Sequence, residues 1–367
     1  MIAGSATPEG TDAYRRRVAA LPEHFRAFNG WWLSSLGIGT YLGEDDATTD
    51  EQYRATVIGV LALGINVVDT AVNYRHQRSE RAIGQGLAAL IAKAAVRREE
   101  VVVATKGGFI PFDGAVPRNP GTYFTETYLR PGIIAPDDVV GGIHCMTPRY
   151  LGDQLERSRR NLGLETVDIY YVHNPETQLQ EVDRPEFLKR MRDAFAFLES
   201  AVKDGKIRLY GTATWNGYRQ HPSAQDYLSL AELAKAAREV AGEGHHFKVV
   251  QLPYNLAMAE AFTRANQPVD GDTVSLLEAA RRLGIYVMVS ASIYQGQLSR
   301  NLPAVLSEHL PGLTTDAQRA LQFVRSTPGV GTALVGMKRV AHVEENAALA
   351  KVAPVPWSHF QKLFKEA

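Results

Sequence analysis

Cysteine is almost absent from this sequence, and so is any excess of charge. Cys145 is the only cysteine in 367 residues, which excludes a disulfide within the chain and a multi-cysteine metal site and is typical of a reducing compartment. The 40 basic residues equal the 40 acidic ones, so no basic surface for nucleic acid is expected. No apolar run reaches the ~18 residues of a membrane span, and no apolar segment follows the N-terminus as in a signal peptide. We therefore expect a cytoplasmic protein that binds neither nucleic acid nor membrane and holds no metal.

The glycine fingerprint of a dinucleotide-binding sheet is also missing. A G-x-G-x-x-G motif should follow a strand and open a helix. The nearest match, G-I-G-T at residues 37–40, lacks the third glycine and continues into Tyr41-Leu42-Gly43. This absence weakens the main rival fold, a doubly wound sheet.

What the sequence does contain is an alternation of strand-like and helix-like segments after residue 29. Such alternation predicts parallel strands joined by helical crossovers. The expected strands are 33–39, 65–71, 101–107, 167–174, 207–215, 248–255, 285–293 and 332–337. The expected helices are 51–63, 79–93, 148–161, 185–203, 224–240, 273–282, 315–324 and 340–351. Eight such units predict a (β/α)8 TIM barrel, with residues 30–367 as one domain and 1–29 as an N-terminal tail or cover with few strand signals.

Two connections are too long to be simple turns, 108–146 and 295–313. Structureless connections of this length in a compact domain are usually functional or disordered. Both follow strand ends on the face where barrel active sites are built. The first contains the aromatic residues Phe109, Phe112, Tyr123, Phe124 and Tyr128, with His144 near its return to the barrel. We expect 108–146 to be a lid-like loop whose aromatic side chains line a substrate pocket; the alternative is that it packs against the barrel side and only stabilises it.

Four side chains with acid-base chemistry follow successive expected strands. Asp69 ends the second strand, Tyr74 lies in the loop after it, Lys106 ends the third and His173 ends the fourth. Neighbouring parallel strands lie ~4.8 Å apart, so these residues can meet at one mouth. The ammonium of Lys106, held by Asp69, would lower the pKa of Tyr74, and the phenol would exchange a proton with a substrate oxygen that His173 orients.

Each of these residues also has a plainer interpretation when taken alone. A lysine at a strand end is usually a salt-bridge partner, a lone histidine is usually a satisfied core residue, and a strand-terminal aspartate often caps a helix. The occurrence of all four on strands two to four, in this order, favours a catalytic site.

The chain at this point resembles the aldo-keto reductases, over roughly residues 33–350. The motifs that carry the resemblance are G-I-G-T-Y at 37–41, D-T-A-V-N-Y at 69–74, A-T-K at 104–106, Y-V-H-N-P at 171–175 and Q-L-P-Y-N at 251–255. The resemblance implies a catalytic tetrad of Asp69, Tyr74, Lys106 and His173. It also implies a nicotinamide cofactor, usually NADP(H) with NAD(H) as the other form, bound across a barrel mouth without a glycine fingerprint.

The resemblance further implies a set of cofactor-binding positions. Gln251 matches the glutamine that meets the nicotinamide carboxamide. Ala213-Thr214 stands where the family usually has Ser-Asn, so Thr214 or Asn216 would replace one carboxamide contact. Ser290 replaces the usual stacking aromatic residue, a role that Trp215 or Tyr294 would take over. The remaining implied positions are Gly39, Thr40, Tyr41, Gln295, Lys338, Arg339, His342, Glu345 and Asn346. Lys338 and Arg339 open the last expected helix, where two cations suit the 2′-phosphate of NADPH; the alternative is that they only coat a helix start.

The leading hypothesis is therefore an NAD(P)H-dependent oxidoreductase that acts on a small-molecule carbonyl or alcohol, with Tyr74 as general acid or base. A nicotinamide-binding regulatory or channel-associated protein with slow or no turnover is the alternative. A Schiff-base aldolase with Lys106 as nucleophile is a third reading, but it needs a neutral amine, which Asp69 opposes. Neither the substrate nor the oligomeric state follows from the sequence.

Overall fold

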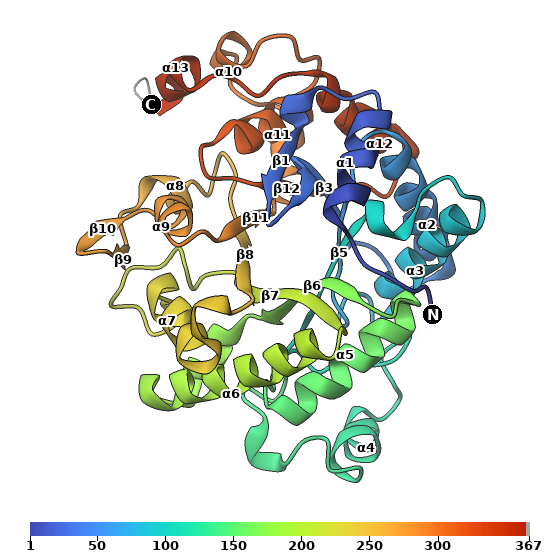
Figure 1. Cartoon of the computed structure of the whole chain (residues 1–367), viewed down its shortest axis with the longest axis vertical. Coiled ribbons are helices and arrows are strands. Elements are labelled where there is room, and N and C mark those ends of the chain that lie inside the picture. The colour runs from blue at the N-terminus through green and yellow to red at the C-terminus, as the bar shows by residue number, and fades with distance from the viewer. Residues whose placement is uncertain (365–367) are drawn as a thin grey trace.

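Eight parallel strands close into a barrel in the computed structural model, which describes residues 1–364. Figure 1 shows the strands at the centre and the helices around them. In order around the barrel the strands are β11 (Tyr286–Ser290), β12 (Thr332–Gly336), β3 (Leu36–Gly39), β4 (Val67–Asp69), β5 (Val102–Gly107), β6 (Val167–His173), β7 (Ile207–Ala213) and β8 (Phe247–Pro253). The predicted (β/α)8 TIM barrel is confirmed.

A helix follows each barrel strand and covers its outer face. These helices are α2 (Ala47–Ala62), α3 (Arg78–Ala92), α5 (Pro148–Leu162), α6 (Arg184–Lys203), α7 (Leu230–Ala241), α9 (Leu276–Arg282), α11 (Asp316–Ser326) and α12 (Val340–Ala347). The Thr147 side chain accepts a hydrogen bond from the Tyr150 amide at the start of α5, as an N-cap should. The expected start of α7 at residue 224 is wrong, because Ser229 caps the helix five residues later. No helix among residues 1–364 is long and apolar enough to cross a membrane.

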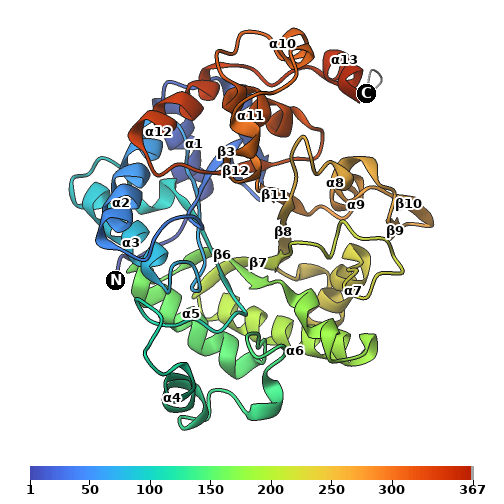
Figure 2. The ribbon, with the colours of Figure 1, turned by 180° about the vertical axis from the view of Figure 1, so that it is seen from behind.

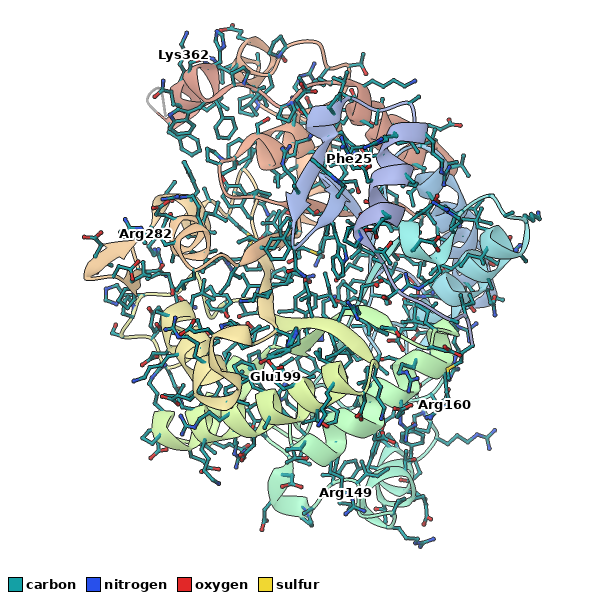
Figure 3. All side chains as sticks on the ribbon, viewed as in Figure 1. Phe25, Arg149, Arg160, Glu199, Arg282 and Lys362 are labelled. Atoms are coloured by element: carbon teal, nitrogen blue, oxygen red, sulfur yellow. The ribbon has the colours of Figure 1, made fainter. Side chains whose placement is uncertain are left out.

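Apolar side chains pack on both faces of the barrel strands. One cluster fills the barrel interior and includes Val67, Val102, Ile169 and Met288. A second and larger cluster lies between the strands and the helices, where neighbouring strand positions such as Val68 point outward. Figure 3 shows side chains filling the space inside the ring of strands. This two-sided burial explains why the strands read as continuous apolar runs in the sequence.

The first residues of the chain cover one end of the barrel. Helix α1 (Pro8–Arg17) is followed by β1 (Phe25–Phe28), which pairs antiparallel with β2 (Trp31–Ser34). The hairpin crosses the near end of the barrel in Figure 1, and Figure 2 shows the opposite end. Trp31 and Leu33 join the interior cluster of the barrel. Strand β1 was not expected from the sequence. The expected strand 33–39 is divided at Ser35, because the residues before Ser35 pair with β1 and those after it enter the barrel.

Several short elements lie outside the repeating units. They are α4 (Pro120–Phe124), α8 (Glu260–Thr263), the hairpin of β9 (Gln267–Val269) and β10 (Asp272–Val274), α10 (Val305–His309) and α13 (Trp357–Phe360). Helix α4 projects beyond the helix ring beside α5 in both views (Figures 1 and 2). The division of the chain into an N-terminal cover, a single barrel domain and a lid stays a prediction.

A buried carboxylate ties the N-terminal cover to the barrel. Asp168 on β6 is fully buried and accepts hydrogen bonds from the amide of Ala6 at 2.7 Å and the amide of Val103 at 2.8 Å. It also forms a 2.7 Å ion pair with Arg98, which is itself buried. Three segments that are distant in sequence therefore share one carboxylate.

We expect Asp168→Ala to lower the free energy of unfolding by about 3–5 kcal/mol, because the Arg98 charge would remain buried without its partner. Denaturant titration measures the effect. Glu51→Ala removes the exposed ion pair with Arg54 and should leave the midpoint almost unchanged. Equal shifts in the two variants would show that Asp168 is no more important than a surface charge.

Candidate active site

A cavity of about 860 Å³ opens among the loops at the carboxyl ends of the strands. This is the end at which residues from different strands of a parallel barrel converge. Asp69, Tyr74 and His173 line the cavity. All twelve positions expected to bind a cofactor line it too: Gly39, Thr40, Tyr41, Thr214, Gln251, Ser290, Gln295, Lys338, Arg339, His342, Glu345 and Asn346.

Lys106 lies directly beneath this cavity and is fully buried. Its ammonium nitrogen is 2.6 Å from Asp69 Oδ2 and donates to the Thr70 carbonyl at 2.8 Å. The same nitrogen lies 4.8 Å from the centre of the Tyr74 ring. The pairing register of β4 and β5 brings Asp69 close to Lys106, because Asp69 at the end of β4 lies opposite Ala104, two residues before Lys106 on β5.

Burial and the neighbouring charges shift the pKa values of Lys106 and Tyr74 in opposite directions. Burial disfavours the Lys106 ammonium, but Asp69 and Tyr74 together raise the pKa of Lys106. The lysine therefore stays charged, which argues against the Schiff-base reading. Burial raises the pKa of Tyr74, and the positive charge of Lys106 only partly opposes this rise. The expected net lowering of the Tyr74 pKa is wrong, because loss of water around the phenol outweighs the nearby ammonium.

His173 faces Tyr74 across the floor of the cavity. The two ring centres are 5.9 Å apart, and the Phe109 ring packs edge-on against the histidine at 5.0 Å. Burial and the charge of Lys106 hold the pKa of His173 well below 6.5, so the imidazole is neutral. Within the described part of the chain, its Nδ1 atom is buried without a hydrogen-bond partner.

A second histidine fixes the backbone behind His173. Gln178 donates its amide hydrogen to His144 Nδ1 at 2.9 Å, which leaves the proton on Nε2. That nitrogen donates to the His173 carbonyl at 2.7 Å. Burial lowers the pKa of His144 to about 4. His144 belongs to the 108–146 segment, so this bond ties the return of the segment to the end of β6.

Gln251 and Thr214 are already engaged in hydrogen bonds within the chain. The Gln251 amide donates to Asp69 Oδ1 at 2.8 Å. The Thr214 hydroxyl donates to Glu176 and accepts from the Gly217 amide at 2.8 Å. Thr214 therefore has no proton left for a carboxamide. Of the two aromatic residues proposed to replace the one missing at Ser290, Trp215 lines the cavity.

The other end of the cavity lies between β12 and α12. Lys338 and Arg339 precede α12, and no side chain caps the first turn of this helix. Its free amide groups and the two cations make this end attractive to an anion. Glu345 is fixed on the same helix through its carbonyl, which accepts from Gln318 at 2.7 Å.

Most aromatic side chains of the 108–146 segment do not reach the cavity. Phe109 lines it, whereas Phe112, Tyr123, Phe124 and Tyr128 form a cluster in which Tyr128 contacts both Tyr123 and Phe124 and also packs on Tyr150 of α5. The expectation that these four line a pocket is wrong, because they bury one another against the barrel side. Arg149, labelled in Figure 3 below α5, donates to the Pro131 carbonyl where the segment returns. The stabilising alternative accounts for this part of the segment.

Comparison with known proteins places this geometry in a family. The profile of the Aldo/keto reductase family matches residues 35–304. The chain belongs to this family. The NADH-specific methylglyoxal reductase of Escherichia coli is 27% identical over 285 residues, which are 76% of this chain and 69% of that protein. A putative voltage-gated potassium channel subunit beta of Schizosaccharomyces pombe is 21% identical over 340 residues, 89% and 87% of the two chains.

Solved aldo-keto reductases share the fold. The holo form of one from Bacillus halodurans superimposes with a TM-score of 0.63 at 20% identity, covering 92% of this chain and 95% of that one. One from Klebsiella pneumoniae, in complex with NADP and acetate, gives a TM-score of 0.61 at 20% identity, covering 94% and 96%. The family is one of NAD(P)-dependent oxidoreductases, which fits the tetrad-like cluster at the barrel mouth.

The structural roles of some residues at the mouth of this aldo-keto reductase were not found from the sequence, although His144 was named there as part of the 108–146 connection. Glu176, His144, Gln178 and Arg219 are buried polar residues that hold the mouth loops. Glu176 stands one residue after the Y-V-H-N-P motif, and this proximity was a usable signal. Gln178 binds His144 across 34 residues and Arg219 binds Glu260 across 41 residues, so no local pattern marked these pairs; Arg219 also donates to the carbonyl of Trp215, four residues earlier.

The neutral state of His144 makes the stability of the protein depend on pH. Its pKa is about 4 when folded and near 6.5 when exposed, so the unfolded chain takes up its proton first as pH falls. The stabilisation is complete above pH 6.5 and should decline by up to about 3 kcal/mol toward pH 4, at about 1.4 kcal/mol per pKa unit. Between pH 6.5 and pH 4 the free energy of unfolding of His144→Gln should fall less steeply than that of the wild type. Parallel plots of the free energy of unfolding against pH for the two proteins would contradict the neutral state of His144.

Proposed function

We propose that this protein is an NADP(H)-dependent oxidoreductase that interconverts a carbonyl compound and its alcohol, with NAD(H) as the weaker cofactor. One observation carries the proposal: a buried, charged Lys106–Asp69 pair lies beneath Tyr74 at the floor of a large cavity. The donor set fits a nicotinamide dinucleotide. Lys338, Arg339 and the start of α12 would hold phosphate groups, and Gln251 lies near the proposed reacting groups.

The residues of the chain divide the chemistry among them. When bound, the nicotinamide supplies a hydride to the carbonyl carbon. Tyr74 gives its proton to the carbonyl oxygen, and Lys106 stabilises the phenolate left behind. Burial raises the pKa of Tyr74 above its ordinary 10.0, so the phenol is protonated at neutral pH, and the Lys106 ammonium, which favours the phenolate, lowers the cost of giving up the proton. Neutral His173, with its proton on Nε2, would donate a hydrogen bond to the same oxygen and orient it.

Replacing the proposed acid should slow the reaction without removing the cofactor site. In Tyr74→Phe we expect carbonyl reduction to fall by at least about 10²-fold, while the dissociation constant for NADPH, followed by nicotinamide fluorescence, stays similar. In the wild type the rate of reduction should stay level through neutral pH and decline only above pH 10, since the pKa of Tyr74 is raised above its ordinary 10.0. Near wild-type turnover by Tyr74→Phe would overturn the assigned mechanism.

The cofactor preference tests the phosphate end of the cavity separately. A 2′-phosphate beside Lys338 and Arg339 gains charge-assisted hydrogen bonds, so NADPH should bind at least about tenfold more tightly than NADH. The variant with Lys338→Ala and Arg339→Ala should lose most of this difference and keep its affinity for NADH. Equal dissociation constants for the two cofactors in the wild type would show that the cations only coat the helix start, and the NADH-specific relative from Escherichia coli makes this a real alternative.

A regulatory or channel-associated protein remains the second candidate, because the match to the potassium channel subunit of Schizosaccharomyces pombe covers nearly the whole of both chains. Such a protein would bind NADPH, but the wild type itself would reduce carbonyl compounds slowly or not at all. The same measurements therefore separate the two functions.

A further inference from the structure

Trp215 is a large aromatic side chain that remains 41% exposed and lines the cavity. It stands two residues beyond Ala213, the last residue of β7, and Ala213 pairs with His173 on β6. The tryptophan therefore belongs to the end of the cavity that holds the proposed reacting groups. An exposed tryptophan costs solvation free energy, so the way in which it is held needs an explanation.

The backbone of Trp215 is held from one side by a buried carboxylate. Glu176 Oε1 accepts hydrogen bonds from the amide of Trp215 at 3.1 Å, from the amide of Asn216 at 3.4 Å and from the Thr214 hydroxyl. Glu176 is only 6% exposed, and burial raises its pKa while these donors oppose the rise. One carboxylate oxygen thus accepts hydrogen bonds from three consecutive residues, 214–216, with the tryptophan in the middle.

A buried cation holds the same residue from the other side. Arg219 is 8% exposed, and its Nε and Nη2 atoms donate to the Trp215 carbonyl at 3.2 and 3.1 Å. Its remaining terminal nitrogen, Nη1, forms a 3.1 Å ion pair with Glu260, which precedes the 267–274 hairpin. Burying charges is costly unless they are well paired. Two buried polar side chains, Glu176 and Arg219, thus fix the backbone of one exposed aromatic residue from both sides.

The opposite side of the mouth carries a matching aromatic residue. Tyr41, which is 59% exposed and lines the cavity, follows β3, and β3 lies across the barrel from β7 (Figure 1). The Tyr41 ring packs edge-on against Tyr74 at 5.1 Å. The charged side chains that line the described cavity are Asp69, which is paired with Lys106, and Lys338, Arg339 and Glu345 at the α12 end. The walls at the reacting end are therefore aromatic and uncharged.

We infer that Glu176 and Arg219 are positioning residues that hold Trp215 as a fixed wall, and that this wall selects uncharged carbonyl compounds bearing a ring. A flat or cyclic group gains contact with the indole face, whereas a carboxylate or phosphate on the substrate finds no cation at this end. The inference rests on the proposed function and adds its specificity.

Three aldehydes test the wall: benzaldehyde, 4-carboxybenzaldehyde and propanal. We expect the wild type to prefer benzaldehyde in kcat/KM. In Trp215→Leu the ratio of kcat/KM for benzaldehyde to that for propanal should fall about three- to tenfold, the range expected for one aromatic contact, mainly through KM. Trp215→Phe should restore part of the ratio. Trp357→Leu is the matched control, because Trp357 is 48% exposed but does not line the cavity.

The positioning role is tested by two variants of Glu176. Glu176→Gln keeps one acceptor oxygen for the amides and should lower the ratio less than Glu176→Ala; the ratio is measured for both aldehydes at saturating NADPH, so a change in cofactor affinity does not enter it. Should the alanine variant not fold, the glutamine variant still carries the test, since an unchanged ratio would overturn the role of the carboxylate. If Trp215→Leu leaves the ratio unchanged, or if the wild type has equal kcat/KM for benzaldehyde and 4-carboxybenzaldehyde, the proposal that Trp215 selects the substrate is wrong.

Failure of the proposed function can be told apart from failure of this inference, because it would abolish carbonyl reduction altogether. If no carbonyl is reduced, equilibrium dialysis with benzyl alcohol tests the wall directly. Weaker binding by Trp215→Leu than by the wild type supports the wall in the absence of turnover, and equal binding overturns it.

Discussion

Closure of eight parallel strands into one barrel is the constraint on which the rest of the molecule depends. Parallel pairing brings the carboxyl ends of all strands to the same rim, and a closed sheet has no edge at which a strand could slip. Asp69, Lys106 and His173 come from three adjacent strands and reach one floor only because their registers are fixed. A shift by one residue would turn each side chain to the other face of the barrel.

The floor of the cavity shows how burial sets the chemistry. Lys106 has no contact with solvent, and its charge is stable there because Asp69 lies 2.6 Å away and Gln251 supports the carboxylate from the other side. The same lack of water raises the pKa of Tyr74 and lowers that of His173. A protonated phenol, a neutral imidazole and a permanent ammonium thus exist side by side, a combination suited to giving a proton to a substrate oxygen.

The loops around the mouth are held by buried polar residues, most of whose partners lie far away in the sequence. His144 connects the return of the 108–146 segment to β6, and Glu176 with Arg219 fixes the turn after β7. Each bond costs desolvation, so each is formed only where its geometry is good. A loop held in this way loses less entropy when a ligand binds, which favours selective binding.

The sequence alone determined the fold class, because eight apolar runs alternating with amphipathic ones admit few other arrangements. It also predicted which four side chains meet at the mouth, because Asp69, Tyr74, Lys106 and His173 each stand at or just past the end of a recognisable strand. Strand β1, the path of the 108–146 aromatics and the net shift of the Tyr74 pKa were decided only by the tertiary structure. They depend on which distant surfaces bury one another: β1 exists because β2 pairs with it, Tyr128 packs on Tyr150 instead of the cavity, and the water excluded around Tyr74 outweighs one nearby charge. Glu176 contacts residues 38 to 40 positions later and Arg219 binds Glu260 41 positions later, so these contacts too were decided by the tertiary structure.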